Sequence, residues 1–240
     1  MQAPIRSFLH TVVGVGNLWF IVGIAGCGPQ IGAVDDFNAI RACFSAFRDA
    51  VETQHGADAV TYVTDDSVER FDAYRQLAIS AIEEDLREHP LVEQIEVLRL
   101  RYFLTPEELH SFTGADVIAR LIDLGILPTP FIQNVQLGTP MFQTDRCFVT
   151  IFDDSGPAKE KMLFVKAGQD WKLDIAAMEF ILGKVYRGMQ RKEQKSAETE
   201  LTLAELDQKV IEATVMKWNS NIDLSKLWEP ISNVQATARN

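Results

Sequence analysis

The hydrophobic repeat of this chain changes twice, and each change limits what the chain can fold into. Between residues 36 and 127, apolar side chains recur at spacings of three and four, the period of amphipathic helices. Pro128 and Pro130 then bracket a linker, after which the period becomes two. Helical spacing returns from residue 176 onward. The chain is therefore predicted to be an α+β protein, with N-terminal helices packed on an antiparallel sheet and further helices at the C-terminus.

Local signals divide the start of the first helical region. Residues 36–51 carry one apolar stripe, and Gly56 breaks it. The cluster Thr64-Asp65-Asp66-Ser67 is a typical helix start. The helix that follows is expected to end at His89-Pro90, because the residue before a proline disfavours the α conformation.

The remaining helices have equally local signals. The helical pattern resumes over residues 91–104, and Thr105-Pro106-Glu107-Glu108 combines a capping hydroxyl, an early proline and a glutamate three residues on. Gly125 closes a further helix. Beyond the sheet, helices are expected over residues 176–191 and 202–218.

The period-two region predicts an antiparallel meander. Strands are expected at residues 131–137, 146–152, 161–166 and 171–175, with turns at residues 153–157 and 168–170. On the second strand, Cys147, Val149 and Ile151 are expected on one face and Phe148, Thr150 and Phe152 on the other. On the last strand, Trp171, Leu173 and Ile175 are expected to point one way, and one face of the meander is expected to lie toward a core.

The first 26 residues have the layout of a secretion signal. Arg6 and the amino terminus supply positive charge, an apolar core runs from Phe8 to Val22, and the small residues Ala25 and Gly26 close it. The run is about as long as a minimal spanning helix of roughly 18 residues, but no Lys/Arg cluster follows it to stop transfer. We therefore expect export and removal of this segment.

Its last residues, Ile24-Ala25-Gly26-Cys27, resemble the lipobox of bacterial lipoprotein precursors. The resemblance implies that the Cys27 thiol is diacylated, that residues 1–26 are cut off before it and that the new amino terminus is acylated. Two or three acyl chains give stable anchoring where one gives only reversible binding. Gly28 replaces the aspartate that favours inner-membrane retention in some Gram-negative bacteria, which points to the outer membrane. The alternative is an uncleaved signal anchor with Cys27 at its edge.

The rest of the chain is acidic. The whole sequence has 34 Asp and Glu against 23 Lys and Arg, a net charge of −11. Removal of residues 1–26 takes away a single basic residue, Arg6, and makes the remaining chain more acidic. An acidic surface is a poor match for nucleic acid or for anionic lipid headgroups. We expect an exported body that meets the membrane through Cys27 and binds no nucleic acid.

Two cysteines remain after Cys27, and the sequence leaves their state open. Cys43 and Cys147 form an even pair, which can form a disulfide in an oxidising compartment. The alternative is two buried thiols, because free cysteine is among the most buried residue types. A disulfide needs Cα atoms within about 7 Å of each other, which spacing in the sequence does not show.

Two segments carry a resemblance to a known family. The apolar helix followed by Gly-Ala-Asp-Ala-Val-Thr-Tyr-Val at residues 56–63 looks like the opening of NTF2-like (cystatin-like α+β cone) domains. Lys-Ala-Gly-Gln-Asp-Trp-Lys-Leu-Asp at residues 166–174 looks like their closing hairpin. The likeness covers residues 35–90 and 130–176. It implies a strongly bent sheet that encloses a cavity.

These patterns and resemblances together predict the boundaries of the segments and domains. We expect a signal peptide (1–26), a flexible tether (27–34), an NTF2-like α+β domain (35–176) with a helical insertion (91–127), C-terminal helices (177–230) and a disordered tail (231–240). The insertion and the C-terminal helices depart from a typical member of the family, and either can cover the mouth of the cone.

The sequence predicts no catalytic residue, no metal site and no cofactor. It has no nucleophile elbow, phosphate loop or zinc-ligand spacing. Glu107 and His110 form a Glu-x-x-His pair, but the second such pair of a carboxylate metal site is missing. The other candidates have structural interpretations as caps, turns, helix ends or core, namely Asp65-Asp66, Asp153-Asp154, His55, His89 and Trp171.

The leading hypothesis is a lipid-anchored cell-envelope protein with a non-catalytic domain that binds a small apolar ligand or another envelope protein. The alternatives are a small-molecule enzyme of the NTF2-like class and an envelope assembly factor. A buried polar group in a pocket would favour the enzyme, and filling of the cavity by Phe148, Phe152 and Phe164 would exclude it. An exposed apolar stripe over residues 91–127 or 202–218 would favour docking.

Overall fold

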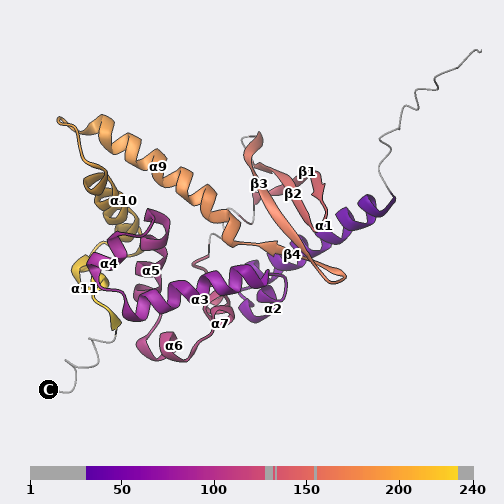
Figure 1. Cartoon of the computed structure of the whole chain (residues 1–240), viewed down its shortest axis with the longest axis horizontal. Helices are drawn as coiled ribbons and strands as arrows, with labels where there is room; N and C mark the ends of the chain where they lie inside the picture. The colour runs from indigo at the N-terminus through magenta and orange to yellow at the C-terminus, as the bar shows by residue number, and fades with distance from the viewer. Residues whose placement is uncertain (1–30, 128–131, 133, 154–155, 232–240) are drawn as a thin grey trace, which may run out of the picture.

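The computed structural model describes residues 31–127, 132, 134–153 and 156–231. Helices and an antiparallel sheet occupy separate stretches of the chain, which confirms the predicted α+β class. Figure 1 shows the sheet and the first helix toward one end of the molecule and the C-terminal helices toward the other. The predicted signal peptide, Cys27 and the tail from residue 232 lie outside the described residues.

The elements follow one another in the predicted order. The helices before the sheet are α1 (Ile31–Glu52), α2 (Gly56–Val60), α3 (Asp65–Ser80), α4 (Glu83–Arg87), α5 (Leu91–Phe103), α6 (Pro106–Ser111) and α7 (Gly114–Asp123). The strands are β1 (Gln136–Gln143), β2 (Arg146–Asp153), β3 (Gly156–Ala167) and β4 (Asp170–Asp174). The last elements are the 3-10 helix η1 (Ala176–Met178), α9 (Glu179–Ser196), α10 (Leu203–Trp218) and α11 (Leu224–Trp228).

The sheet is the predicted meander, with strand order β1-β2-β3-β4 and antiparallel pairing throughout. The buried face of β2 carries Cys147, Val149 and Ile151, and Trp171, Leu173 and Ile175 in and after β4 are buried as well. The first strand was placed too early, because β1 begins at Gln136 and continues through Pro140. A proline is tolerated there because β1 is an edge strand and its register shifts between Leu137 and Pro140.

Helix α1 packs across one face of the sheet. Its predicted stripe is buried at Ile40, Phe44, Phe47 and Val51, and the Phe44 ring meets Phe164 of β3 edge-on with 6.4 Å between centroids. The helix begins at Ile31, earlier than expected. Residues 31–34 of the predicted tether are therefore helical, and residues 27–30 lie outside the described part of the chain.

The segment after α2 extends the sheet at its far edge. Leu173 of β4 donates its backbone N–H to Tyr62 at 2.8 Å, and Thr64 donates to Leu173 at 3.0 Å, so Val63 forms a parallel bridge with β4. Gly56 starts α2 and does not merely end α1. A Cβ at Gly56 would lie 2.0 Å from the Ala119 carbonyl oxygen, so only glycine lets α2 approach α7 this closely.

Residues 91–127 are part of the helical core. The predicted apolar face of α7 is fully buried against α2 and α3, and it consists of Val117, Ile118, Leu121 and Ile122. The capping box predicted at Thr105 and Glu108 is present, and Gly125 closes α7 with a φ of +67° as expected.

The helix predicted to run to His89 is broken in two at Ala81, whose backbone is extended. The reason is the buried guanidinium of Arg101 on α5. It donates to five backbone carbonyls, those of Leu77, Ala78, Ala81, Leu227 and Trp228. These carbonyls lie at the end of α3 and in α11, so one side chain joins three helices. Burial lowers the pKa of Arg101 to about 10, which leaves it protonated at neutral pH.

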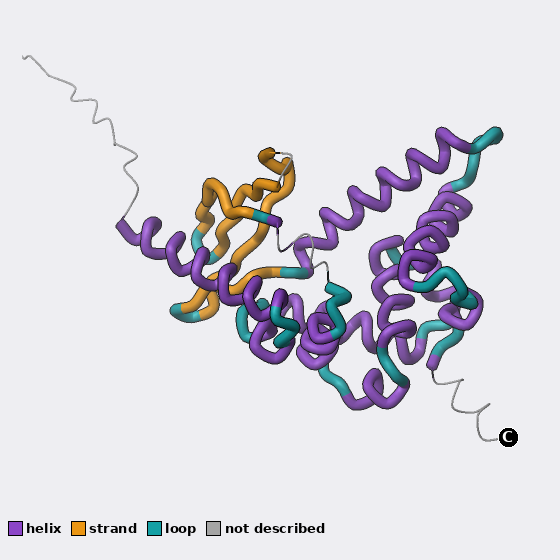
Figure 2. Tube along the Cα trace, turned by 180° about the vertical axis from the view of Figure 1, so that it is seen from behind, coloured by secondary structure: helices purple, strands orange, loops and turns teal. Residues whose placement is uncertain are grey.

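The C-terminal helices fold back over α5. Helix α9 leads away from the sheet, ends at Ser196, and α10 returns beside it (Figure 2). Trp218 at the end of α10 stacks on Tyr102 of α5 with 5.8 Å between ring centroids. The polar stretch from Arg191 is thus mostly the exposed end of α9. Among the described residues, no helix combines the length and apolar character needed to span a bilayer.

Cys43 and Cys147 are both free and buried, so the disulfide between them is not formed. Cys43 lies on α1 with Sγ 4.0 Å from the Tyr62 carbonyl oxygen, and Cys147 lies on the buried face of β2. Burial raises the pKa of each thiol to about 11.

Replacement of Arg101 by lysine should lower the free energy of unfolding by about 3 kcal/mol, because one ammonium cannot serve carbonyls on several sides and leaves buried acceptors unpaired. Urea unfolding measures this change. Arg120→Lys is the control, since Arg120 pairs with Glu108 at the surface and such pairs contribute about 1 kcal/mol or less. Equal losses in the two variants would contradict the role of Arg101.

Neither Cys43 nor Cys147 should react with iodoacetamide in the folded protein at about pH 8, because both thiols are buried and protonated. Both should react after unfolding in urea without reductant, as mass spectrometry of the peptides measures. A peptide pair joined through these two cysteines would be the opposite result.

Candidate functional site

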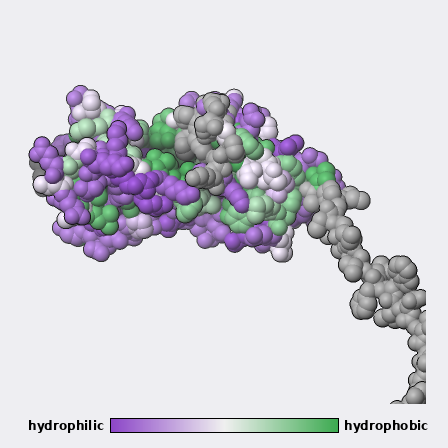
Figure 3. All heavy atoms as spheres, turned by 90° about the horizontal axis from the view of Figure 1, so that it is seen from above, coloured by the Kyte–Doolittle hydropathy of each residue, from purple (hydrophilic) through white to green (hydrophobic). Residues whose placement is uncertain are grey.

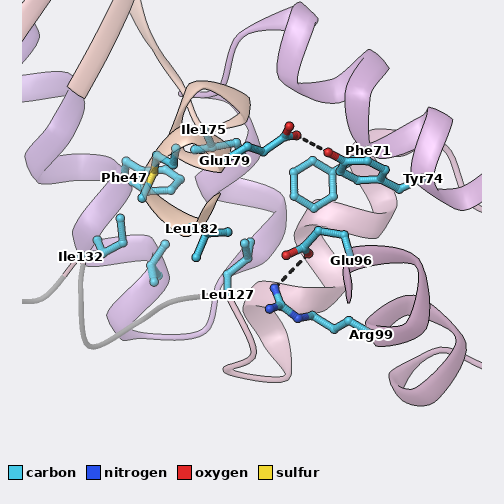
Figure 4. Close-up of a pocket in the computed structure, with 12 residues that line it drawn as sticks. Phe47, Phe71, Tyr74, Glu96, Arg99, Leu127, Ile132, Ile175, Glu179 and Leu182 are labelled. Carbon is cyan, nitrogen blue, oxygen red and sulfur yellow. Dashed lines mark hydrogen bonds and ion pairs between the residues drawn. The ribbon is translucent and has the colours of Figure 1, made fainter. Parts of the chain in front are cut away.

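A pocket lies where α1, α3, α5 and α9 meet, beyond the end of β4 (Figure 4). Most of its wall is apolar, and this part consists of Phe47, Val51, Phe71, Leu127, Ile132, Ile175, Met178 and Leu182. The centres of water molecules can reach about 40 Å³ of it. Since one water needs roughly 10–15 Å³ on this measure, the pocket has room for about three waters or a small organic group.

One ion pair, Glu96 with Arg99, forms part of the wall. The two residues are one turn apart on α5, and Arg99 Nη1 lies 2.9 Å from Glu96 Oε2. Their side chains are only 5% and 11% exposed, for Glu96 and Arg99 respectively. Glu96 Oε1 and Arg99 Nε have no hydrogen-bond partner among the described residues. The pair is therefore half-satisfied, which is rare for buried polar groups and is often found at binding or reactive sites.

A second polar group in the wall is fully engaged. The Tyr74 hydroxyl of α3 donates to Glu179 at the start of α9. Arg70 donates to both oxygens of the same carboxylate, at 3.0 Å from Nε and 3.1 Å from Nη2, and its Nη2 also lies 2.6 Å from Glu93 Oε1. This network fixes the start of α9 against α3 and closes one side of the pocket.

The buried position changes the acidity of these groups. Burial raises the pKa of Glu96; the nearby Arg99 acts against this rise and Glu179 adds to it. Burial and the bond to Glu179 raise the pKa of Tyr74, and burial raises to about 12 the pKa of Tyr186, which lies near Glu96 and Arg99 but outside the wall. Both phenols therefore stay neutral at physiological pH. The wall offers Glu96 as a group able to hold a proton and Arg99 as a donor.

The local sequence explains why these side chains face inward. Helix α5 is enclosed on several sides by α3, α9, α10 and α11, so its run Gln94, Ile95, Glu96, Val97 and Leu98 is buried without interruption. A polar residue in such a helix must find a partner inside the protein. Gln94 does so by donating to the His89 carbonyl at 2.7 Å, whereas Glu96 reaches only Arg99.

The residues discussed from the sequence are scattered and do not meet in this pocket. His110 and Glu107 are exposed on α6, while Glu108 caps that helix. His55 is exposed beside Thr53, whereas His89 lies 2.9 Å from Glu93 and so touches the Arg70 network.

The remaining sequence candidates lie at a helix start, in the core or partly outside the described residues. Thr64 caps α3, with Asp65 and Asp66 in its first turn, and Trp171 is buried as a core residue. The predicted turn at Asp153-Asp154 lies partly outside the described residues. Within the described ranges, no group of three His, Cys, Asp or Glu side chains could hold a metal ion.

The phenylalanines expected to fill a cavity do not fill this one. Phe164 is buried against α1, Phe148 is half-buried, Phe152 near the end of β2 is 38% exposed, and none of the three lines the pocket. The condition that would have excluded an enzyme is therefore absent here. The condition that favours one, a buried polar group with a raised pKa in a pocket, is present at Glu96.

Comparisons with known proteins leave the site to be judged on its own geometry: no family model, no curated protein and no solved structure matches this chain.

Sequence reasoning missed the whole site. The usable signal was Glu96, a single acidic residue between Ile95 and Val97-Leu98 with Arg99 one turn later. Such a pair usually lies on an exposed helix face, and only the packing of α9 and α10 over α5 makes it internal.

Glu96 should make the free energy of unfolding depend on pH. Its pKa is raised in the folded state above the value of about 4.5 for an exposed glutamate, so the folded protein holds this proton more tightly than the unfolded chain does. The associated stability is complete below about pH 4.5 and is lost as the pH rises through the folded pKa, with a slope of up to about 1.4 kcal/mol per pH unit.

Urea unfolding of wild type and Glu96→Gln between about pH 4.5 and pH 8 measures this contribution. The free energy of unfolding of wild type minus that of the variant should fall as the pH rises. A difference that is constant or grows with pH would contradict a raised pKa at Glu96.

Proposed function

We propose that this protein is a lipid-anchored envelope protein whose α+β body binds a small, mostly apolar molecule in the pocket between α1, α3, α5 and α9. The observation that carries the proposal is the half-satisfied Glu96–Arg99 pair at the edge of an apolar wall. Binding pockets typically combine apolar lining with a few convergent polar groups. Apolar surface also gathers in the recess between the two ends of the molecule (Figure 3).

The proposal includes an NTF2-like arrangement of the core. Three features support it: α1 lies across an antiparallel meander, the segment at Val63 adds to the edge of β4, and β4 is the closing strand expected from residues 166–174. The helices α5 to α7 and α9 to α11 are additional to that pattern. They supply most of the polar side of the pocket, so the site would be particular to this chain.

The anchor is part of the same proposal and rests on Ile24-Ala25-Gly26-Cys27. A Cys27→Ser precursor should lose incorporation of labelled fatty acid and should keep residues 1–26, because the thiol that is acylated before cleavage is gone. Metabolic labelling and migration on a denaturing gel measure the two changes, and Cys43→Ser is the control that should show neither. A Cys27→Ser protein that is labelled and migrates like wild type would refute the anchor.

Binding can be tested without knowing the ligand. The protein is purified gently from its own envelope, and small molecules released by denaturation are compared between wild type and Leu182→Trp by mass spectrometry. Leu182 is half-buried in the pocket wall, so tryptophan there should displace the ligand. The matched control is Val185→Trp on the same helix, since Val185 is 53% exposed. A compound enriched in wild type and the control, but lost in Leu182→Trp, is the expected result.

If wild type, Leu182→Trp and Val185→Trp release the same small molecules, the pocket has no binding function. A melting temperature within a few degrees of wild type is required of Leu182→Trp, so that loss of the compound reports on the pocket.

A second candidate function, acid–base catalysis on a small molecule, is favoured by one observation, the raised pKa of the buried Glu96 carboxyl. It is distinguished by turnover. Envelope metabolites incubated with wild type would then show a substrate consumed and a product formed, and Glu96→Gln would abolish both. The assembly-factor alternative is less favoured, because the exposed Leu203 and Met216 lie at opposite ends of α10 and form no stripe.

A further inference from the structure

Two atoms at the polar side of the pocket have unused hydrogen-bonding capacity, and they specify the ligand. Arg99 Nε is a donor, and Glu96 Oε1 is an oxygen that accepts when the carboxyl is ionised and can also donate when it is protonated. Figure 4 shows the Glu96 carboxyl turned toward the apolar side chains of Leu127 and Leu182. With 5% of the Glu96 side chain exposed, bulk water is a poor partner for it.

The charged side chains around the pocket are already paired with one another. Arg99 pairs with Glu96, and Arg70 pairs with both Glu179 and Glu93. The phenols of Tyr74 and Tyr186 are neutral, since burial raises the pKa of each. An anionic ligand would lie against Glu96 and Glu179, and a cationic one against Arg99. Either would place an uncompensated charge in a nearly dry wall, which is strongly unfavourable.

We propose that the bound molecule is neutral, with an apolar body and one hydroxyl or carboxamide group that accepts a hydrogen bond from Arg99 Nε and donates one to Glu96 Oε1. This inference rests on the binding function proposed above. A hydroxyl or carboxamide supplies a donor and an acceptor together, whereas a hydrocarbon or a ketone would leave Glu96 Oε1 unpaired.

The pocket also limits the size of the part that enters it. About 40 Å³ open to water centres accommodates a body of only a few heavy atoms beside the polar group. Four-carbon molecules are therefore suitable probes. They dissolve well in water, and molecules of this size bind with dissociation constants on the order of 1 mM.

The experiment compares 1-butanol, butanamide, butanone, butanoate and butylammonium as ligands of the full-length protein. Titration followed by methyl NMR measures each dissociation constant, because isoleucine, leucine and methionine methyls line the pocket. Butanol and butanamide should bind, and butanoate and butylammonium should bind at least about tenfold more weakly. A charged probe that binds as tightly as butanol would overturn the inference, and so would butanone if it matched butanol.

Glu96→Gln sharpens the test because it removes the anionic partner of Arg99 and keeps the shape of the side chain. Butanoate should then bind at least about tenfold more tightly than to wild type, whereas butanol should not gain affinity. No gain for butanoate would show that the Glu96–Arg99 balance does not set the preference, which would also overturn the inference.

Failure of this inference can be told apart from failure of the proposed function. If a charged probe binds best and Leu182→Trp abolishes its binding while Val185→Trp does not, the pocket binds small molecules but the ligand class is wrong. If no probe gives a saturable shift, the unpaired atoms are satisfied by water only. That result would overturn the inference, and the comparison of extracts would then decide the binding function by itself.

Discussion

The buried guanidinium of Arg101 is the interaction on which the helical half of the molecule depends. A charge in the interior is tolerated only when its donors are paired, and Arg101 pairs them with backbone carbonyls of α3 and α11. These bonds satisfy carbonyls at the end of α3, which ends at Ser80, and hold α11 against α5. Glu96 and Arg99 lie on the same helix, five and two residues before Arg101, so the bonds of Arg101 also hold this pair in place.

The site therefore combines two kinds of polar group with different roles. Arg70, Tyr74 and Glu179 satisfy one another and give the wall rigidity. Glu96 and Arg99 satisfy one another only in part, and the Glu96 carboxyl is turned toward the apolar space. The fully paired network can hold the wall rigid while the partly paired one keeps hydrogen-bonding capacity for a ligand.

The sequence specified the fold better than the site, and for a physical reason. Local signals predicted what depends on neighbours along the chain, such as the shared face of Cys147, Val149 and Ile151 and the capping of α6 by Thr105. The errors lie where distant residues decide. Arg101 breaks a helix that propensity would continue, and the C-terminal helices turn an ordinary Glu–Arg helix pair into an internal one. No periodicity reports such contacts between remote segments.

The early start of α1 has a consequence for how the protein would stand on a membrane. Only four peptide units separate Cys27 from Ile31, a reach of at most about 14 Å. An acylated Cys27 would therefore hold the first turn of α1 close to the headgroups. Phe47 lies sixteen residues further, about 24 Å along the helix axis. If α1 stood along the membrane normal, the pocket wall around Phe47 would therefore lie above the headgroups.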